Sequence, residues 1–342
     1  MTQVSPMRGF GGSATDSPFV THDADFAAVL GDAPRLVRVV ATDAHEGPVY
    51  APHEDALYFT TVPARRDAPV PGTPEVAIKR LALDGERFPL EPERVTVIRS
   101  DANSANGMAL DASGALVVCE QGSRARDAAI ARVDPVTGER TTLVDSWDGL
   151  ALNSPNDVVA RSDGSVWFTD PSYGHLQGFR PEPEIGDFVY RHDPSTGRLV
   201  VVADGFDKPN GLAFSPEEDV LYVTDSGANQ EEGSYYAARP HHVKAFDVVA
   251  GRRLANERLF AVTTPGFPDG IKVDAAGRVY ASSFSGVQVF SVDGDLIGEI
   301  RLPGAVNFVF GGPERNVLFI TTDDAIWAAV LETTAPEPPN GA

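Results

Sequence analysis

Residues 156–170 read NDVVARSDGSVWFTD, and this stretch decides the fold. Two short runs rich in Val, Trp and Phe flank the turn residues Arg161–Gly164, a pattern that is typical of a β-hairpin. Two more such runs follow, and the turn-forming residues 193–197 separate them. The four expected strands are Asn156–Ala160, Val166–Asp170, Phe188–Arg191 and Leu199–Ala203. The stretch therefore predicts one antiparallel unit of four strands.

The unit recurs along the chain, and each copy begins with a side chain that carries an oxygen donor. Six such residues, 38 to 60 residues apart, open the copies: Glu46, Asn106, Asn156, Asn210, Asp269 and Asn307. Glycine or aspartate follows five of them, and a second apolar run begins ten or eleven residues later. Four-stranded repeats of this length are typical of propeller blades. We therefore predict an all-β fold, a six-bladed β-propeller with four antiparallel strands per blade.

The last copy has room for only three strands, the third of which is expected within residues 325–331. The apolar run Arg35–Val40 is expected to supply the missing outer strand and to close the ring, which would leave no strand edge exposed. Residues 31–332 are then a single propeller domain. Residues 1–30 are expected to be a flexible N-terminal arm, and the proline-rich residues 333–342 a disordered C-terminal tail.

The chain is acidic, with a formal net charge of −21 at pH 7. A surface of this charge repels nucleic acids and anionic membranes, so we expect neither as a partner. No apolar run approaches the roughly 20 residues of a membrane span, and no signal-peptide pattern is expected at the start. Cys119 is the single cysteine and lies in an apolar run, so we expect it to be buried. We expect a cytoplasmic protein that acts on a small molecule; its oligomeric state stays open.

The geometry of a blade brings distant polar residues together. The start of a first strand lies beside the end of the second strand, at the open end of their hairpin. The opening residues should therefore share one mouth of the central channel with the residues that end the second strands: Thr61, Glu120, Asp170, Asp225, Ser283 and Thr321. Carboxylates this close repel one another unless a cation or protons neutralise them. One Asn-Gly pair usually marks only a turn, but six equivalent positions predict a site for a hard cation such as Ca²⁺ or Mg²⁺.

Several motifs resemble those of the SMP-30/gluconolactonase/LRE-like family of six-bladed propellers. The matching segments are EGPVY (46–50), NSPND (153–157), FTDPSYG (168–174), KPNGLAFS (208–215) and PDGI (268–271). The resemblance runs from residue 35 to residue 331. It implies that one divalent metal, usually Ca²⁺, is held by Glu46, Asn156, Asn210 and Asp269, although Mg²⁺, Mn²⁺, Fe²⁺ or Zn²⁺ could replace it. It also implies hydrolysis of a sugar lactone or a related ester.

For this reaction we expect the metal to polarise the lactone carbonyl and to position water for attack. Asp269 is the expected general base, because a carboxylate beside the metal can accept the proton of water. Glu46 is the second catalytic candidate, mainly as a ligand. Seven further residues are expected to contact water or substrate: Asn106, Glu120, Asn153, Asp170, Tyr173, His175 and Asn307. Asp225 is expected to orient Asn210, and His45 is interpreted as structural because strand alternation points it away from Glu46.

Two alternatives to a sugar lactonase stay open. One is a hydrolase of other esters or of organophosphates that uses the same metal, and the other is a ligand-binding propeller whose metal is structural. The carboxylates Glu46 and Asp269 favour an enzyme. Serine-hydrolase, zinc-protease and P-loop motifs are absent. Substrate choice is expected to depend on the loops 174–186 and 229–240, in which we read no specificity.

Overall fold

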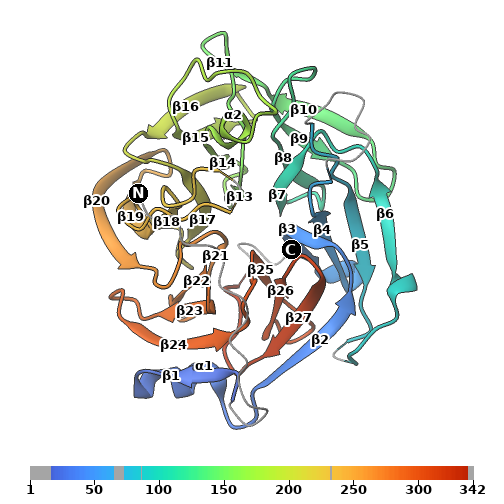
Figure 1. Cartoon of the computed structure of the whole chain (residues 1–342), viewed down its shortest axis with the longest axis vertical. Coiled ribbons are helices and arrows are strands. Elements are labelled where there is room, and N and C mark those ends of the chain that lie inside the picture. The colour runs from blue at the N-terminus through green and yellow to red at the C-terminus, as the bar shows by residue number, and fades with distance from the viewer. Residues whose placement is uncertain (1–16, 65–72, 86, 232, 338–342) are drawn as a thin grey trace.

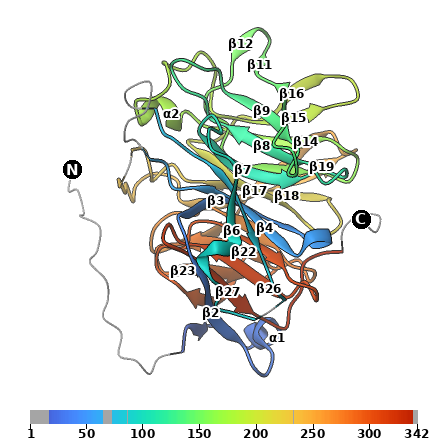
Figure 2. The ribbon, with the colours of Figure 1, turned by 90° about the vertical axis from the view of Figure 1, so that its right-hand side faces the viewer.

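Six antiparallel sheets surround a common axis, as the sequence predicts (Figure 1). The computed structural model describes residues 17–64, 73–85, 87–231 and 233–337. In this part of the chain, each blade has its first strand beside the axis and its outer strand at the rim, and Figure 2 shows the ring turned by 90°. The predicted all-β six-bladed propeller is confirmed.

In the first four blades, each strand pairs with the next one along the chain. The first two blades contain β3 (Ala44–Ala51), β4 (Ala56–Thr61), β5 (Ile78–Ala82) and β6 (Val95–Arg99), then β7 (Ala105–Leu110), β8 (Leu116–Glu120), β9 (Ala129–Val133) and β10 (Arg140–Val144). The next two contain β13 (Val158–Ala160), β14 (Val166–Asp170), β15 (Phe188–Asp193) and β16 (Arg198–Ala203), then β17 (Pro209–Phe214), β18 (Val220–Asp225), β19 (His242–Val249) and β20 (Arg253–Val262). A small hairpin, β11 (Ser146–Trp147) and β12 (Leu150–Ala151), links the second blade to the third.

The N-terminal side of the chain closes the ring. The sixth blade consists of β25 (Phe308–Gly311), β26 (Val317–Thr321), β27 (Ala325–Val330) and, as its outer strand, β2 (Arg35–Ala41). Strands β2 and β27 are antiparallel. The predicted closure by residues 35–40 is confirmed, and the strand extends one residue further.

The prediction of a flexible arm at residues 1–30 is wrong for its second half. Strand β1 (Phe19–Thr21) pairs with β24 (Leu296–Arg301) and adds a fifth strand to the blade that also holds β21 (Ile271–Val273), β22 (Val279–Ser283) and β23 (Gly286–Phe290). A 3-10 turn (Ala24–Phe26) and the short helix α1 (Ala27–Leu30) follow, and Phe26 and Val29 are completely buried. Burial of these two side chains anchors a segment whose composition suggested a loose arm. Residues 1–16 lie outside the described residues.

The C-terminal segment is also held in place as far as it is described. Thr333 is buried, and its hydroxyl donates a hydrogen bond of 2.8 Å to Asp274. The N–H of Ala335 bonds to the carbonyl of Arg315. The predicted disorder is therefore wrong for residues 333–335, and residues 338–342 lie outside the described residues.

The core lies between neighbouring blades. Six clusters of buried apolar side chains, one for each pair of adjacent blades, fill these interfaces, with large residues such as Trp167, Phe168 and Tyr280. Both faces of a blade are covered, so second strands such as β14 and β26 are apolar over most of their length and buried throughout. Because both faces of these strands are buried, they occur in the sequence as continuous apolar runs and not as alternating apolar and polar residues.

Helices contribute little. Besides α1, the described residues contain the one-turn helix α2 (Tyr173–Leu176) and 3-10 turns at Pro52–Glu54 and Pro92–Arg94. Within the described part of the chain, none of these helices has the length and apolar character needed to cross a membrane. Cys119 is buried, as expected.

Candidate metal centre

The opening residues of the blades and the ends of the second strands lie at the same mouth of the ring. In the fourth blade, Pro209 pairs with Asp225. In the second blade, Ala105 pairs with Glu120. Because each opening residue is within one or two positions of such a pair, the hairpin register confirms that both sets of residues meet at one end of the strands.

Glycine after the opening residue lets neighbouring inner strands approach closely. A Cβ on Gly211 would lie 2.3 Å from the carbonyl oxygen of Asp269, on the next blade. A Cβ on Gly47, whose φ is +55°, would lie 2.5 Å from the carbonyl oxygen of Asn106. Only glycine fits such contacts. The repeated Glu-Gly and Asn-Gly pairs therefore serve the packing of strands around the axis.

Three of the four predicted metal ligands converge at this mouth. The Asn210 amide and the charge of Glu46 both act on the Asp269 carboxyl, the first lowering and the second raising its pKa, so the three side chains lie close together. Asn307 Nδ2 donates a hydrogen bond of 2.7 Å to Glu46 Oε2. Four blades thus contribute side chains to one cluster. Residues 46 and 307 belong to the first and the sixth blade, which are far apart in the sequence but adjacent in the ring.

The fourth predicted ligand, Asn156, holds the equivalent position on the third blade. Its carbonyl accepts a hydrogen bond of 2.7 Å from the Gly107 N–H of the second blade. Its side chain is 5% exposed, and that of Asn210 is 4% exposed. Asn156 precedes β13 by two residues, and its backbone N–H bonds to the carbonyl of Thr169 at 2.9 Å, which places it at the same mouth.

The electrostatics of the cluster favour a bound cation or protons. Burial raises the pKa of the Asp269 carboxyl well above its ordinary value, and the charge of Glu46 raises it further. The charge of His45 and the Asn210 amide act in the opposite direction. Two neighbouring carboxylates that repel each other are a common feature of cation sites, because a cation relieves the repulsion.

The donor set fits a hard divalent cation. Among residues 17–64, 73–85, 87–231 and 233–337, no three His, Cys, Asp or Glu side chains form a group that could hold a metal. The predicted ligand set instead combines the carboxylates of Glu46 and Asp269 with the amide oxygens of Asn156 and Asn210. Oxygen-only donors of low charge fit Ca²⁺ or Mg²⁺, whereas zinc usually takes His or Cys ligands.

Asp157 adds a carboxylate that the sequence analysis did not assign to the site. Its Oδ1 accepts the N–H of Val158 at 2.8 Å, while its Oδ2 is buried without a hydrogen-bond partner in the described structure. Burial raises the pKa of Asp157 to about 6, with Lys272 opposing the rise and Glu46 adding to it. The sequence does distinguish this position. Glycine follows the opening residue in four of the other blades, whereas Asp157 follows it in the third blade.

Asp170 and Asp225, which end the second strands of the third and fourth blades, hold the loops before the opening residues. Asp170 accepts the backbone N–H groups of Asn153 and Ser154, at 2.9 and 2.8 Å. Asp225 does the same for residues 207 and 208, at 3.0 and 2.9 Å. Both carboxylates are at most 1% exposed. The substrate contact predicted for Asp170 is therefore not supported, whereas Asp225 positions the segment that leads into Asn210.

We expect Asp170→Asn to destabilise the fold without changing substrate affinity. An amide offers one acceptor where the carboxylate offers two, so one buried N–H loses its partner at a cost of about 1–3 kcal/mol. Chemical denaturation would measure the loss, and KM of the folded variant should stay at the wild-type value. A raised KM with unchanged stability would restore the predicted substrate contact.

The Glu120 carboxylate also forms hydrogen bonds with other groups of the protein. It is 1% exposed, and both its oxygens accept hydrogen bonds of 2.7 Å from the Arg140 guanidinium. Asn103 Nδ2 donates a further bond of 3.0 Å to Oε2. A carboxylate that is buried and paired with arginine in this way is directed at Arg140, so the predicted substrate contact of Glu120 is not supported either.

Tyr173 and Asn106 are better placed for contact with a ligand. Burial and then the charge of Asp269 raise the pKa of the Tyr173 hydroxyl, which donates a hydrogen bond of 3.3 Å to the carbonyl of Ser226. Asn106 is partly exposed on β7, and its Oδ1 is buried without a hydrogen-bond partner in the described structure. Asn307 contacts Glu46 instead and fixes its orientation.

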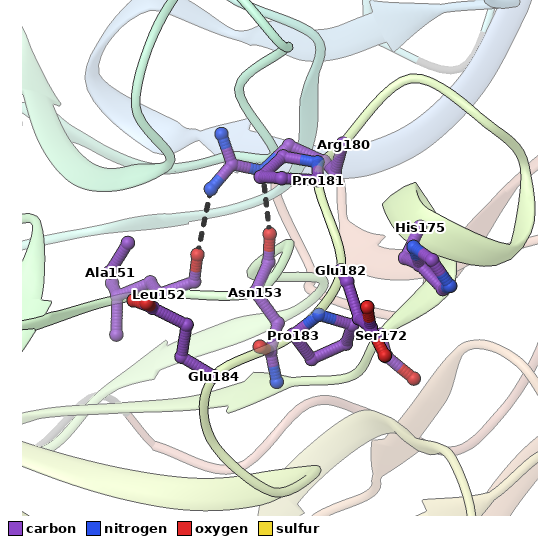
Figure 3. A pocket seen from close by; sticks show the side chains of 10 residues that line it. All are labelled: Ala151, Leu152, Asn153, Ser172, His175, Arg180, Pro181, Glu182, Pro183 and Glu184. Atoms are coloured by element: carbon purple, nitrogen blue, oxygen red, sulfur yellow. Dashed lines mark hydrogen bonds between the residues drawn. The ribbon is translucent and has the colours of Figure 1, made fainter.

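Asn153 and His175 line a separate cavity of about 250 Å³ (Figure 3). Its walls also include Ser172, Glu182 and Glu184. Figure 3 shows the Arg180 guanidinium bonded to the carbonyls of residues 152 and 153, at 2.9 Å each, which fixes the floor of the cavity. Both residues therefore remain candidates for contact with a polar ligand at the α2 side of the mouth.

Comparison with known proteins identifies the family. The model of the SMP-30/Gluconolactonase/LRE-like region matches residues 44–324, which is most of the chain. The chain belongs to this family. It is 31% identical over 276 residues to the gluconolactonase of Zymomonas mobilis, covering 79% of this chain and 73% of that protein. It is 27% identical over 297 residues to a pentonolactonase of Haloferax volcanii, covering 84% of each.

Solved structures of the family agree with the fold. A gluconolactonase of Xanthomonas campestris is 34% identical and superposes with a TM-score of 0.75, covering 96% of this chain and all of that one. The calcium-binding protein regucalcin of Agrobacterium tumefaciens is 17% identical, with a TM-score of 0.64. The second comparison supports the propeller fold alone.

His45 lies closer to the family's ligand position than strand alternation suggested. Its Nδ1 lies 2.6 Å from Asp323 Oδ1. Burial lowers the pKa of His45, but the bond to Asp323 and the charges of Glu46 and Asp269 outweigh it and raise the pKa overall. Residues 44 and 46 are offset by a bulge in the β3–β4 register, and this irregularity breaks the alternation on which the prediction depended.

Proposed function

We propose that the protein is a metal-dependent hydrolase of a lactone, with a sugar lactone as the first substrate to test. The observation that carries the proposal is the convergence of Glu46, Asn210 and Asp269 at one mouth of a propeller of this family. The relatives described as gluconolactonase and pentonolactonase support the substrate class. Fold alone would not assign an activity.

Four residues have defined roles in this proposal. Glu46, Asn156, Asn210 and Asp269 would hold one divalent cation, with Ca²⁺ favoured by the all-oxygen donors. A cation bound there would supply Lewis acidity toward the lactone carbonyl. Asn307 keeps the Glu46 carboxylate in place through its 2.7 Å hydrogen bond.

The chain's own acid–base group is Asp269, which is partly exposed at the mouth. Its carboxylate accepts a proton from the water whose oxygen attacks the carbonyl carbon. The bond between that carbon and the ring oxygen then breaks. The proton held on Asp269 passes to the leaving alkoxide, so that lactone and water give one hydroxy acid.

We expect chelation to abolish lactone hydrolysis reversibly. Glu46, Asn210 and Asp269 form a cluster that a cation neutralises, so removing the cation removes the chemistry while the propeller stays folded. The assay is hydrolysis of glucono-δ-lactone by proton release, before and after EDTA and after addition of Ca²⁺, Mg²⁺, Mn²⁺, Fe²⁺ or Zn²⁺. Circular dichroism before and after EDTA controls for unfolding.

Full activity of a metal-free, folded protein, checked by elemental analysis, would contradict the metal dependence. Turnover of phosphotriesters or simple aryl esters, with none of any lactone, would select the other hydrolase instead. A metal-loaded protein that hydrolyses none of these esters would select the ligand-binding alternative.

A further inference from the structure

Three aromatic side chains from two blades form a continuous surface, which we call the aromatic wall: Tyr235, Phe267 and Phe284. The ring centroids of Tyr235 and Phe284 are 5.3 Å apart at an interplanar angle of 59°. Those of Phe267 and Phe284 are also 5.3 Å apart, at 75°. Tilted and edge contacts of this kind are favourable geometries for aromatic pairs.

The aromatic wall stands beside the general base of the proposed reaction. Phe267 precedes Asp269 by two residues. The Asp269 N–H donates a hydrogen bond of 2.9 Å to Ser282 Oγ, and Phe284 follows two residues later, in the turn just after β22. Two of the three rings therefore lie within a short stretch of backbone from the Asp269 carboxylate.

The third ring comes from the fourth blade, in the loop between β18 and β19. This loop is tied to the neighbouring backbone, because the Ala228 N–H bonds to the carbonyl of Pro240 at 2.7 Å. An ion pair of 2.9 Å between Arg239 and Asp207 fastens it further. Tyr235 is thus presented by a fixed loop, one of the two in which we expected substrate choice to lie.

The position of the Phe284 ring also depends on a neighbouring glycine. A Cβ on Gly266 would lie 2.5 Å from the Phe284 ring, so only glycine leaves room for the ring in this position. The Phe284 N–H bonds to the carbonyl of Pro265 at 3.0 Å. The ring is therefore packed on one face, yet Phe284 remains 47% exposed overall.

Phe284 is not an isolated exposed apolar side chain, because its ring packs against those of Tyr235 and Phe267. Exposed apolar patches rimmed by polar groups mark binding sites more often than isolated apolar residues do. On the α2 side of the mouth, the cavity adds the polar side chains Ser172, His175 and Glu182 to apolar ones. The three rings of the wall, by contrast, are all aromatic.

We propose that the aromatic wall determines substrate specificity by binding an apolar substituent of the lactone, so that the substrate class is lactones that carry an alkyl or aryl group on the ring. This inference rests on the proposed lactone hydrolysis at the same site. Phe267 and Phe284 offer no hydrogen-bond donor or acceptor in their side chains, so they match hydrocarbon and not hydroxyl groups. A hydroxyl placed against them would lose its water without gaining a partner.

The test compares Phe284→Ala with wild type on two six-membered lactones, δ-decalactone, which carries a pentyl chain, and glucono-δ-lactone, which carries hydroxyls. We expect KM for the pentyl lactone to rise about tenfold or more, with kcat nearly unchanged, and KM for the sugar lactone to change less than about twofold. Phe284→Leu keeps apolar bulk and should restore most of the affinity. Val292→Ala is the control, because Val292 is 56% exposed in the hairpin between β23 and β24, at the end of the same blade away from the mouth.

Equal changes in KM for both lactones, or a change in kcat alone, would overturn the inference while leaving lactone hydrolysis intact. If wild type hydrolyses neither lactone, the proposed function fails, and the wall is tested separately by calorimetry with the lactam 6-pentylpiperidin-2-one. Binding of this lactam that weakens about tenfold in Phe284→Ala supports the wall. Absence of binding to wild type, or binding unaffected by the substitution, rejects it.

Discussion

Replacing Glu46 by Gln will weaken divalent-metal binding by about 100-fold or more, because it removes one of only two carboxylates among the four proposed ligands. The glutamine amide keeps an oxygen that can accept the hydrogen bond of 2.7 Å from Asn307, so the local structure should persist. Calorimetric titration with Ca²⁺ measures the affinity. Hydrolysis at a fixed, low metal concentration should fall by about the same factor, because the metal-loaded fraction falls with affinity.

The same substitution should stabilise the metal-free protein. Burial and the charge of Glu46 raise the pKa of the Asp269 carboxyl. A raised carboxyl pKa means that the folded state binds protons that the unfolded state has released, so the free energy of unfolding falls as pH rises above about 4. Removing the Glu46 charge lowers that pKa, so the free energy of unfolding should decrease less as the pH rises.

Metal should stabilise the wild type much more than Glu46→Gln. A ligand at 100 times its dissociation constant adds about 2.7 kcal/mol to the free energy of unfolding, and Glu46→Gln should lose most of that gain. The matched control is Glu93→Gln, which removes an exposed carboxylate from a turn of the same blade. Wild-type metal affinity in Glu46→Gln would show that this carboxylate is not a ligand.

The fold could be predicted because the sequence repeats its own geometry. The six predicted ends of the second strands, from Thr61 to Thr321, coincide with the ends in the structure. These strands are apolar over most of their length because blades cover both faces, and polar turns bound them. Residues 19–30 could not be predicted in the same way, because their order depends on burial of Phe26 and Val29 against a blade that residues 271–301 form much later in the chain.

The candidate site was predictable in position but less so in chemistry. Repetition places Glu46, Asn210 and Asp269 at one mouth, since strand register follows from the hairpins. The direction of a side chain at a strand end does not follow from register. The Glu120 carboxylate bonds to Arg140, and the Asp170 carboxylate bonds to backbone N–H groups. The sequence repeat indicates neither of these partners.

Bulges limit the prediction further. A register shift between residues 44 and 46 invalidates the alternation that pointed His45 away from Glu46. Similar shifts precede Met108 and Leu212 on other inner strands. The inner strands bulge where glycine allows neighbouring blades to approach, so the irregularity falls at the site itself, where pattern rules that assume regular strands are least applicable.

Asp269→Asn should lower kcat by about 100- to 10,000-fold, the usual contribution of a positioned general base. The amide can still offer an oxygen to a cation and a hydrogen-bond partner to Asn210, but it cannot accept the proton of the attacking water. The measurement is kcat for lactone hydrolysis at several metal concentrations up to saturation. Asp293→Asn, at an exposed hairpin of the same blade, is the matched control and should leave kcat unchanged.

Saturation with metal separates the two roles of this carboxylate. If Asp269 only ligates the metal, a higher metal concentration will restore the wild-type kcat, and the assignment of the base is wrong. If it is the base, kcat stays low when the site is full, and the acidic limb of the wild-type pH–rate profile disappears in the variant. That limb exists because burial and the Glu46 charge raise the pKa of Asp269, so that lowering the pH protonates the base and stops proton transfer.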